Sequence, residues 1–294
     1  MMLSPNMRGA ALMSASMAGF ALNDTALKYG GTDLGLFPAI FVRGIFAVCF
    51  MSIFAYAFGA FSNLPKAKDI RLIGIRSFAE IGATLAFLTA LFNLPLANIT
   101  ALLQATPLSI ALAAAIFLSE PIGRKRIAAI VVGFIGVMII VRPGLDGFNA
   151  YALLGLVAVA FVTLRDLTAR QLSPKVPTLL VAFVASVAIM LTGGVGILVT
   201  QTWQTPTPFE LSILGLSAVF LMIGYYCSVA TMRIGDVAIV SSYRYTVMIW
   251  AIALGWLVFG DIPDRWTIIG MLVILSAGLF TMWRERKLAK SKRS

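Results

Sequence analysis

Stretches of about 20 mostly apolar residues follow one another along the chain, and they constrain its fold more than any other feature. A helix of that length crosses the roughly 30 Å hydrocarbon core of a bilayer, because it rises about 1.5 Å per residue. A chain that is 60% hydrophobic and only 12% charged is also too apolar for an ordinary soluble domain. We therefore predict an all-α integral membrane protein with ten transmembrane helices. The predicted spans are 9–29, 34–60, 70–90, 97–118, 126–143, 151–171, 177–200, 210–233, 236–259 and 266–283.

The net charge of +11 could indicate nucleic-acid binding, so the positions of the basic residues decide its meaning. They lie mainly in short loops and in the segment 284–294, and they do not form a basic face with interleaved aromatic residues. With a cytoplasmic N-terminus, 16 lysines and arginines fall on the cytoplasmic side and three on the other. This excess is typical of cytoplasmic loops. We expect both termini in the cytoplasm and no nucleic-acid partner.

The sequence lacks the residues that enzymatic chemistry needs. No histidine is present, and the two cysteines, Cys49 and Cys227, each lie inside an apolar run. No nucleotide-binding loop and no nucleophile motif is found, which excludes the common routes of ATP hydrolysis and acyl transfer. We predict a protein that is not an enzyme and has no cofactor and no metal site. Any transport by it would use an ion gradient or the gradient of the substrate.

The chain also contains an internal repeat. Residues 94–120 align with residues 235–261 at a constant offset of 141, so that Thr100 meets Ser241 and Glu120 meets Asp261. We predict a first repeat over 1–144, a second over 145–283 and a basic cytoplasmic tail over 284–294. Each repeat would hold five helices, and this odd number places the two halves in the membrane with opposite orientation. Inverted repeats with a site near the midplane are a transporter architecture.

The segments "ALFNLPLANITALLQATPLSIALAAAIFLSEPIGRKR" at 90–126 and "GFIGVMIIVRPG" at 133–144 resemble the EamA domain of the drug/metabolite transporter superfamily. The second half repeats this pattern more loosely. The resemblance covers nearly the whole chain and implies a multi-pass transporter of the bacterial inner membrane. It is specific to the superfamily and not to a substrate.

Three patches are closer to one branch of that superfamily. They are Asn23-Asp24 followed by Lys28, "FVRG" at 41–44, and "SYRYTVMIW" at 242–250. These patches are similar to bacterial importers of S-adenosylmethionine and of riboflavin. The S-adenosylmethionine importers tend to have a proline before Tyr-Arg-Tyr, where this chain has Ser242.

An arginine inside an apolar span needs an explanation, because its charge costs roughly 2.5–3.5 kcal/mol at the centre of a bilayer. Arg244 lies between Tyr243 and Tyr245 near the middle of its span, and Arg43 and Glu80 come out at a similar depth. These charges could pair and fasten helices together, or they could line a central cavity and contact a polar substrate, or both. A tyrosine ring beside a guanidinium can hold a flat heterocycle by stacking and cation–π contact.

Other polar residues within the spans complete the candidate substrate site. Asn23 and Asp24 follow a small, apolar stripe in the first span, although Asp24 could also pair with Lys28 one turn on. Gln104 offers an uncharged donor and acceptor, and Pro107 after it frees a carbonyl and favours a kink. The predicted substrate-binding residues are Arg244, Tyr243, Tyr245, Arg43, Glu80, Asn23, Asp24 and Gln104.

Two further charge groups favour structural pairing. Arg76 lies one turn before Glu80 and could neutralise it in place, whereas Arg165, Asp166 and Arg170 suggest a self-paired cluster that reaches toward the cytoplasm. Counting Arg43, Arg76 and Arg244 against Glu80 favours a neutral flat substrate such as riboflavin over a cationic one. The alternatives are S-adenosylmethionine import and export of amino acids or drugs. A membrane enzyme or a non-transporting receptor is a further possibility, and the sequence leaves the oligomeric state open.

The charge distribution makes a testable prediction about topology. Cysteines introduced at Lys66 and Lys125 should be labelled by a membrane-impermeant thiol reagent only from the cytoplasmic side. A cysteine at Gln204 should be labelled only from the opposite side. Labelling from the reverse side at any of the three positions would contradict the ten-span arrangement.

Overall fold

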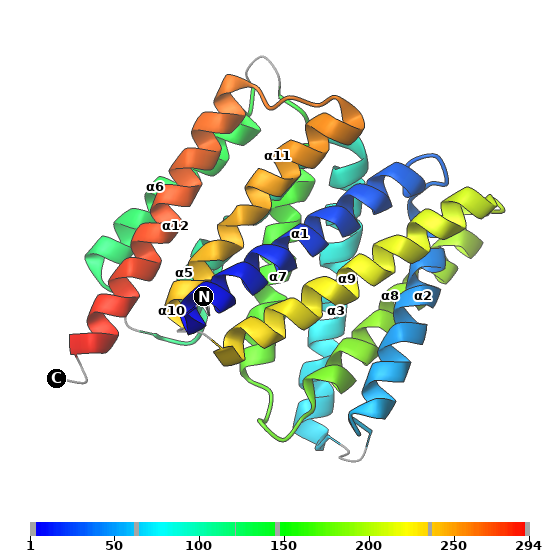
Figure 1. Cartoon of the computed structure of the whole chain (residues 1–294), viewed down its shortest axis with the longest axis horizontal. Coiled ribbons are helices and arrows are strands. Elements are labelled where there is room, and N and C mark those ends of the chain that lie inside the picture. Colours follow the sequence, from blue (N-terminus) through cyan, green and yellow to red (C-terminus); the bar gives the residue numbers. More distant parts are fainter. Residues whose placement is uncertain (1–3, 62–64, 121, 145–147, 235–236, 292–294) are drawn as a thin grey trace. The chain divides into compact units, whose positions relative to one another are not determined.

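The computed structural model describes residues 4–61, 65–120, 122–144, 148–234 and 237–291, and all its regular elements there are helices. Residues 235–236, at the start of the second repeated segment, lie outside the described residues. The helices are α1 (Pro5–Gly31), α2 (Leu36–Ala57), α3 (Ala67–Asn93), α4 (Leu96–Leu103), α5 (Thr106–Phe117), α6 (Arg124–Val141), α7 (Tyr151–Arg170), α8 (Thr178–Thr200), α9 (Pro208–Ile234), α10 (Val237–Val240), the 3-10 helix η1 (Ser241–Tyr245), α11 (Thr246–Phe259) and α12 (Arg265–Ser291) (Figure 1).

The expected all-helical fold is confirmed, since each predicted span coincides with a helix or with a broken helix. Eight stretches are long and apolar enough to cross a membrane: 36–57, 67–93, 96–117, 151–170, 178–200, 208–228, 241–259 and 265–284. α1 and α6 are not among them. Serines, glycines and the Asn23-Asp24 pair lower the mean hydropathy of α1. α6 has only 18 residues, of which the first three are cationic.

The internal repeat reappears in the helix boundaries. α3 covers 67–93 and α9 covers 208–234, so both ends lie 141 residues apart. α6 and α12 likewise begin at 124 and 265. The offset seen in the sequence therefore extends well beyond residues 94–120.

The described helices form two compact units. Unit 1 comprises 1–25, 94–153 and 220–294, and unit 2 comprises 26–93 and 154–219. Each unit draws on both halves of the sequence, and α1, α7 and α9 contribute residues to both.

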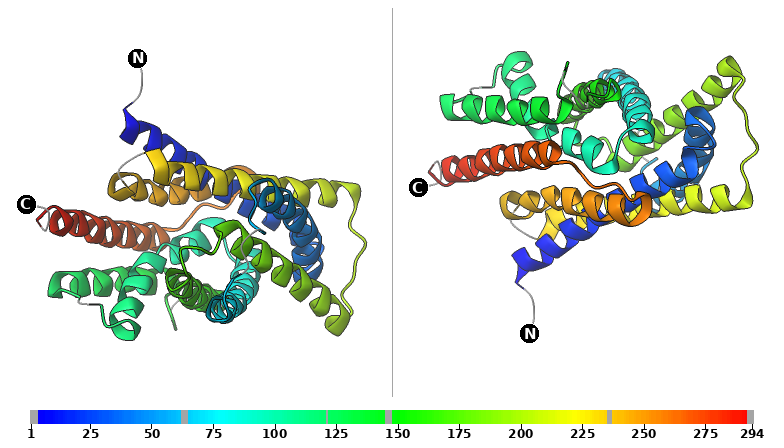
Figure 2. Two further views of the ribbon diagram at one scale, coloured as in Figure 1. Left: turned by 90° about the horizontal axis from the view of Figure 1, so that it is seen from below. Right: turned by 90° about the horizontal axis from the view of Figure 1, so that it is seen from above.

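In unit 1, α6 packs along α12, its counterpart in the repeat (Figure 1, Figure 2). A Cβ atom added at Gly136 would lie 2.9 Å from the carbonyl oxygen of Gly270, so only a glycine allows the two backbones to approach this closely. α1 and α9 meet in the same way, and Ser16 Oγ donates a 2.7 Å hydrogen bond to the carbonyl of Gly224. Without a hydrophobic force between helices in lipid, such close contacts provide the packing energy.

In unit 2, the counterparts α2 and α8 pack together, and α8 also contacts α3. A Cβ atom at Gly193 would lie 2.6 Å from the backbone nitrogen of Phe41, and one at Gly44 would lie 2.8 Å from the Cβ of Met190. α2 and α8 therefore meet through small residues, as α6 and α12 do in unit 1.

An ion pair joins the ends of α6 and α12 in unit 1. Arg142 ends α6 in a left-handed conformation (φ 49°), and its Nη2 contacts Oδ2 of Asp264. Asp264 directly precedes α12 and caps it, because its Oδ1 accepts a 2.9 Å hydrogen bond from the Thr267 amide. Partial burial acts to raise the pKa of the Asp264 carboxyl, but the hydrogen bonds from Thr267 and the Arg142 guanidinium outweigh it and hold that pKa below its usual value.

This cap generates a prediction about stability and pH. We expect Asp264→Ala to lower the free energy of unfolding at neutral pH by about 1 kcal/mol, the typical value of an N-cap. A carboxyl with a lowered folded-state pKa stabilises the fold above its unfolded pKa of about 3.9, and loses that contribution as the pH falls through the folded-state value. The difference between wild type and variant should therefore shrink in acid, as measured by thermal unfolding in detergent.

Asp264→Asn is the matched control, because it keeps the cap acceptor and removes only the charge. We expect a smaller loss than in Asp264→Ala, since half-exposed ion pairs contribute at most about 1 kcal/mol. Equal losses in the two variants would show that the ion pair, and not the cap, stabilises this end of α12.

Candidate substrate-binding site

Two broken helices lie at equivalent positions of the repeat, both in unit 1. The first is interrupted at Gln104 and Ala105, between α4 and α5, and the second passes through the 3-10 turn η1 between α10 and α11. Gln104 and Tyr245 are 141 residues apart, so the interruptions coincide in the repeat. The sequence predicted continuous helices over 97–118 and 236–259, with a kink only near Pro107, and the second break is therefore a correction.

The two breaks are closed by the same kind of hydrogen bond. Pro107 has no N–H to donate to the carbonyl of Leu103, and that carbonyl instead accepts a 2.6 Å hydrogen bond from Thr106 Oγ1. In the second break, Thr246 Oγ1 donates to the carbonyl of Tyr243 at 2.7 Å. A threonine at the first position of the following helix therefore bonds a carbonyl three residues earlier in both repeats. Only the Leu103 carbonyl lacks its helical donor, since the Tyr243 carbonyl also accepts from the backbone N–H of Thr246.

The second break leaves two residues of the Tyr-Arg-Tyr motif exposed and buries the third. Tyr243 is 41% exposed and Arg244 is exposed as well, whereas Tyr245 is buried and only 6% of its surface is exposed. The Tyr245 ring packs against α12, where a Cβ atom added at Gly278 would collide with its hydroxyl. That hydroxyl has no hydrogen-bond partner among the described residues.

Gln104 and the Asn23-Asp24 pair are the other predicted site residues in unit 1. Gln104 is partly buried at the C-terminal end of α4, and α4 packs against α11 and α12. Asn23 is buried in α1 and donates a 2.8 Å hydrogen bond to Oδ1 of Asp24. The amide therefore orients the carboxylate next to it.

Glu80 lies in unit 2 between two arginines. Arg76 Nη2 is 3.4 Å from its Oε2, and Arg165 Nη1 on α7 donates a 3.1 Å hydrogen bond to its Oε1. The Glu80 side chain is only 15% exposed. Arg165 also donates through Nε to Oδ1 of Asp166 at 2.8 Å. Both carboxylate oxygens of Glu80 are thus held by a guanidinium group.

Arg165 has a partner that the sequence interpretation did not identify. The expected pairing with Asp166 is present, and the same guanidinium also reaches Glu80, 85 residues earlier in the chain. Arg165 therefore links the Asp166 pair to the Glu80 cluster. No local pattern could show this, because the contact depends on how α7 packs beside α3.

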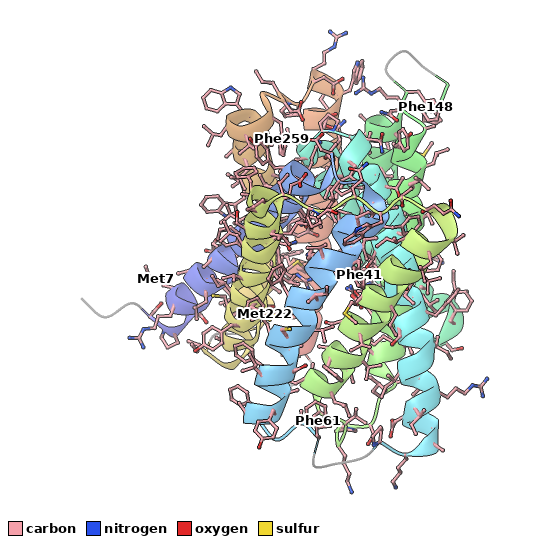
Figure 3. All side chains as sticks on the ribbon, turned by 90° about the vertical axis from the view of Figure 1, so that its right-hand side faces the viewer. Met7, Phe41, Phe61, Phe148, Met222 and Phe259 are labelled. Atoms are coloured by element: carbon pink, nitrogen blue, oxygen red, sulfur yellow. The ribbon has the colours of Figure 1, made fainter. Side chains whose placement is uncertain are left out.

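Arg43 is the remaining predicted site residue in unit 2. Arg43 on α2 and Glu80 on α3 are both partly buried. α2 and α3 run in opposite directions within unit 2 (Figure 3). That Arg43 and Glu80 share one environment stays a prediction.

Comparison with known proteins identifies the family. Residues 7–142 and 149–283 each match the EamA-like transporter family. The chain belongs to this family. Among the described residues, no three His, Cys, Asp or Glu side chains are grouped as a metal site.

Several relatives of this EamA-family protein have named activities. It is 27% identical over 281 residues to an S-adenosylmethionine uptake transporter of Rickettsia prowazekii, covering 94% of this chain and 93% of that one. It is 25% identical over 287 residues to a riboflavin transporter of Vibrio cholerae, covering 96% and 95%. A pseudopaline exporter of Pseudomonas aeruginosa is 26% identical and covers 64% of this chain and 66% of its own length.

A solved structure supports the fold alone. A crystal structure of a protein with 19% identity matches with a TM-score of 0.58 and covers 94% of this chain and 98% of that chain. The family and the bacterial relatives together make this chain a multi-pass transporter of the bacterial inner membrane.

The Glu80 cluster generates a prediction about stability. Glu80→Gln should leave Arg76 and Arg165 close together without the charge that lies between them. Removing one member of a buried ion pair costs about 3–5 kcal/mol, so we expect a lower thermal midpoint and a lower yield of folded protein. The measurement is thermal unfolding of the purified variant in detergent.

A double variant separates this pairing from a general effect of the glutamate. Glu80→Gln combined with Arg165→Gln should recover part of the stability lost in the single variant, because one of the two facing charges is removed with the carboxylate. Additive losses would contradict the pairing that the structure shows.

Proposed function

We propose that this EamA-family protein imports a flat heterocyclic metabolite such as riboflavin. The proposed mechanism is alternating access between two inverted halves, 1–144 and 145–283, with both termini and the tail 284–294 in the cytoplasm. The relatives with named uptake activities support import, and the matched helix boundaries of the two repeats support a pair of equivalent halves.

The observation that carries the proposal is the arrangement of Tyr243 and Arg244 on a broken helix. Broken helices are where transporters place substrate sites, because the interrupted backbone and nearby side chains offer polar groups at depth in the membrane. Tyr243 and Arg244 are exposed in η1, so a ring face and a planar set of donors are accessible together. A flat heterocycle could stack on the ring and accept hydrogen bonds from the guanidinium.

The charges support a neutral substrate over a cationic one. A sulfonium such as that of S-adenosylmethionine needs a carboxylate, and both oxygens of Glu80 are already engaged by Arg76 and Arg165. Arg165 joins this cluster together with Asp166, so the two add no net charge to the three arginines and one glutamate counted from the sequence.

Two alternatives have specific support. Asp24, oriented by Asn23, is a carboxylate that could hold a sulfonium, and the Rickettsia relatives are named for S-adenosylmethionine uptake. The similarity to a pseudopaline exporter supports export. Uptake and efflux of labelled riboflavin and labelled S-adenosylmethionine in proteoliposomes would distinguish the three.

The proposal makes a prediction about Arg244. Arg244→Lys keeps the charge and loses the planar fork, so it should weaken riboflavin binding by about tenfold or more while leaving the thermal midpoint nearly unchanged. Tyr243→Ala should weaken binding more than Tyr243→Phe, because only the alanine removes the stacking ring. Affinity, uptake rate and thermal midpoint would be measured for each variant.

Tyr245→Phe is the matched control for Tyr243→Phe, and it tests the buried hydroxyl. Loss of a buried hydroxyl without a partner should leave the fold as stable as wild type or slightly more stable. A simultaneous loss of riboflavin affinity would show that the substrate pairs with this hydroxyl. Unchanged affinity in both Arg244→Lys and Arg244→Ala, with lower stability in the latter, would make Arg244 a structural residue and refute the proposed site.

A further inference from the structure

The outer face of α6 in unit 1 carries an apolar groove next to a basic cluster. The groove is lined by apolar side chains only, among them Leu112 of α5 and Ile127, Val131, Phe134, Ile135 and Met138 of α6. The α6 residues recur every three or four positions, which places them along one stripe of the helix. Four of them, Ile127, Val131, Ile135 and Met138, are between 44% and 53% exposed.

The groove has the length of one leaflet. From Ile127 to Met138 the helix rises about 16 Å, and half of the roughly 30 Å hydrocarbon core is about 15 Å. A single acyl chain could therefore lie along the whole groove. Any apolar membrane surface faces lipid, so the groove alone would not indicate a particular one.

Basic residues lie at one end of the groove. Arg124 is three residues before Ile127, so it shares the face of α6 that carries the groove. Lys125 and Arg126 follow Arg124, and Arg284 of α12 approaches the same point, because its Nη2 would lie 3.5 Å from a Cβ atom added at Gly123. Acidic residues also lie near this cluster in the sequence: Glu120 is three positions before Gly123, and Glu285 follows Arg284.

The start of α6 strengthens this positive end. Gly123 provides no side-chain cap, and the first turn of α6 contains no acidic residue. The positive end of the helix dipole therefore adds to the charges of Arg124 and Lys125, and no acidic side chain in the first turn offsets it. Trp283 on α12 is 56% exposed, and Lys287 Nζ lies 5.6 Å from its ring centroid. Tryptophan is typical of the interface between headgroups and hydrocarbon.

We propose that this face binds one anionic phospholipid. Its phosphate lies at the start of α6 against Arg124 and Arg284, and one acyl chain occupies the groove from Ile127 to Met138. The occupant is assigned by charge complementarity at one end and by an apolar groove of leaflet length at the other. This inference is independent of the transported substrate.

The test is lipid binding to the full-length purified protein in detergent. Dioleoylphosphatidylglycerol should raise the thermal midpoint and be retained in native mass spectrometry, and dioleoylphosphatidylcholine, with the same chains, should do neither. Glycerol 3-phosphate should have no effect, since it lacks the acyl chain. Equal effects of the two phospholipids would overturn the proposal, as would stabilisation by glycerol 3-phosphate.

Two matched pairs of variants locate the site. Arg124→Gln should raise the half-saturating concentration of phosphatidylglycerol about fivefold, which corresponds to about 1 kcal/mol for a basic residue near an anionic lipid. Lys125→Gln removes the same charge from a different face of α6 and should have a clearly smaller effect. Equal effects would indicate only a general attraction to the positive end of unit 1 and would overturn the assigned position.

The groove is tested by filling it. Val131→Trp should abolish retention of phosphatidylglycerol, whereas Val132→Trp, at a neighbouring exposed position that does not line the groove, should leave it unchanged. Indistinguishable retention in the two variants would overturn the acyl-chain placement. Riboflavin binding to Val131→Trp should equal that of wild type, so failure of this inference is distinguishable from failure of the proposed function.

Discussion

The need to pair every backbone N–H and C=O in apolar surroundings determines most of this structure. In hydrocarbon an unpaired backbone group costs several kcal/mol, and a helix avoids that cost by pairing its own groups. Where a helix is interrupted, another donor must take over, as the Thr106 hydroxyl does for the Leu103 carbonyl at the first break. At the second break the Tyr243 carbonyl accepts from both the backbone N–H and the hydroxyl of Thr246. A break that is satisfied locally can place polar side chains at depth. The Tyr-Arg-Tyr motif occupies such a break.

Charge pairing is the second constraint, and it bears on the substrate that we propose. Glu80 could have been a receptor for a cation, but Arg76 and Arg165 occupy both of its oxygens. Arg244 is placed differently, because it is exposed in η1. The same residue type can therefore pair with a carboxylate in one part of the chain and remain exposed in another. What differs between these arginines is how far each is buried and whether a neighbouring helix supplies a carboxylate.

Small residues decide which helix faces pack and which face lipid. α6 presents Gly133 and Gly136 toward its neighbours in unit 1, where an added Cβ atom would meet Leu108 or the backbone of Gly270. The stripe from Ile127 to Met138 on the same helix carries larger side chains that stay half exposed. One side of α6 thus allows close approach of neighbouring helices, and the opposite side carries the apolar groove. The grooved side is where we place a phospholipid.

The sequence by itself determined the all-helical membrane fold, the internal repeat and the break near Pro107, because each depends on local properties: the length of apolar runs, a constant offset and a missing N–H. It could not determine the second break, since 241–245 contains no proline and its 3-10 geometry arises from its surroundings. The ion pair between Arg165 and Glu80 and the close packing of the Tyr245 ring against Gly278 also required the tertiary structure. These contacts join residues tens of positions apart, and only the packing of whole helices decides which side chains meet.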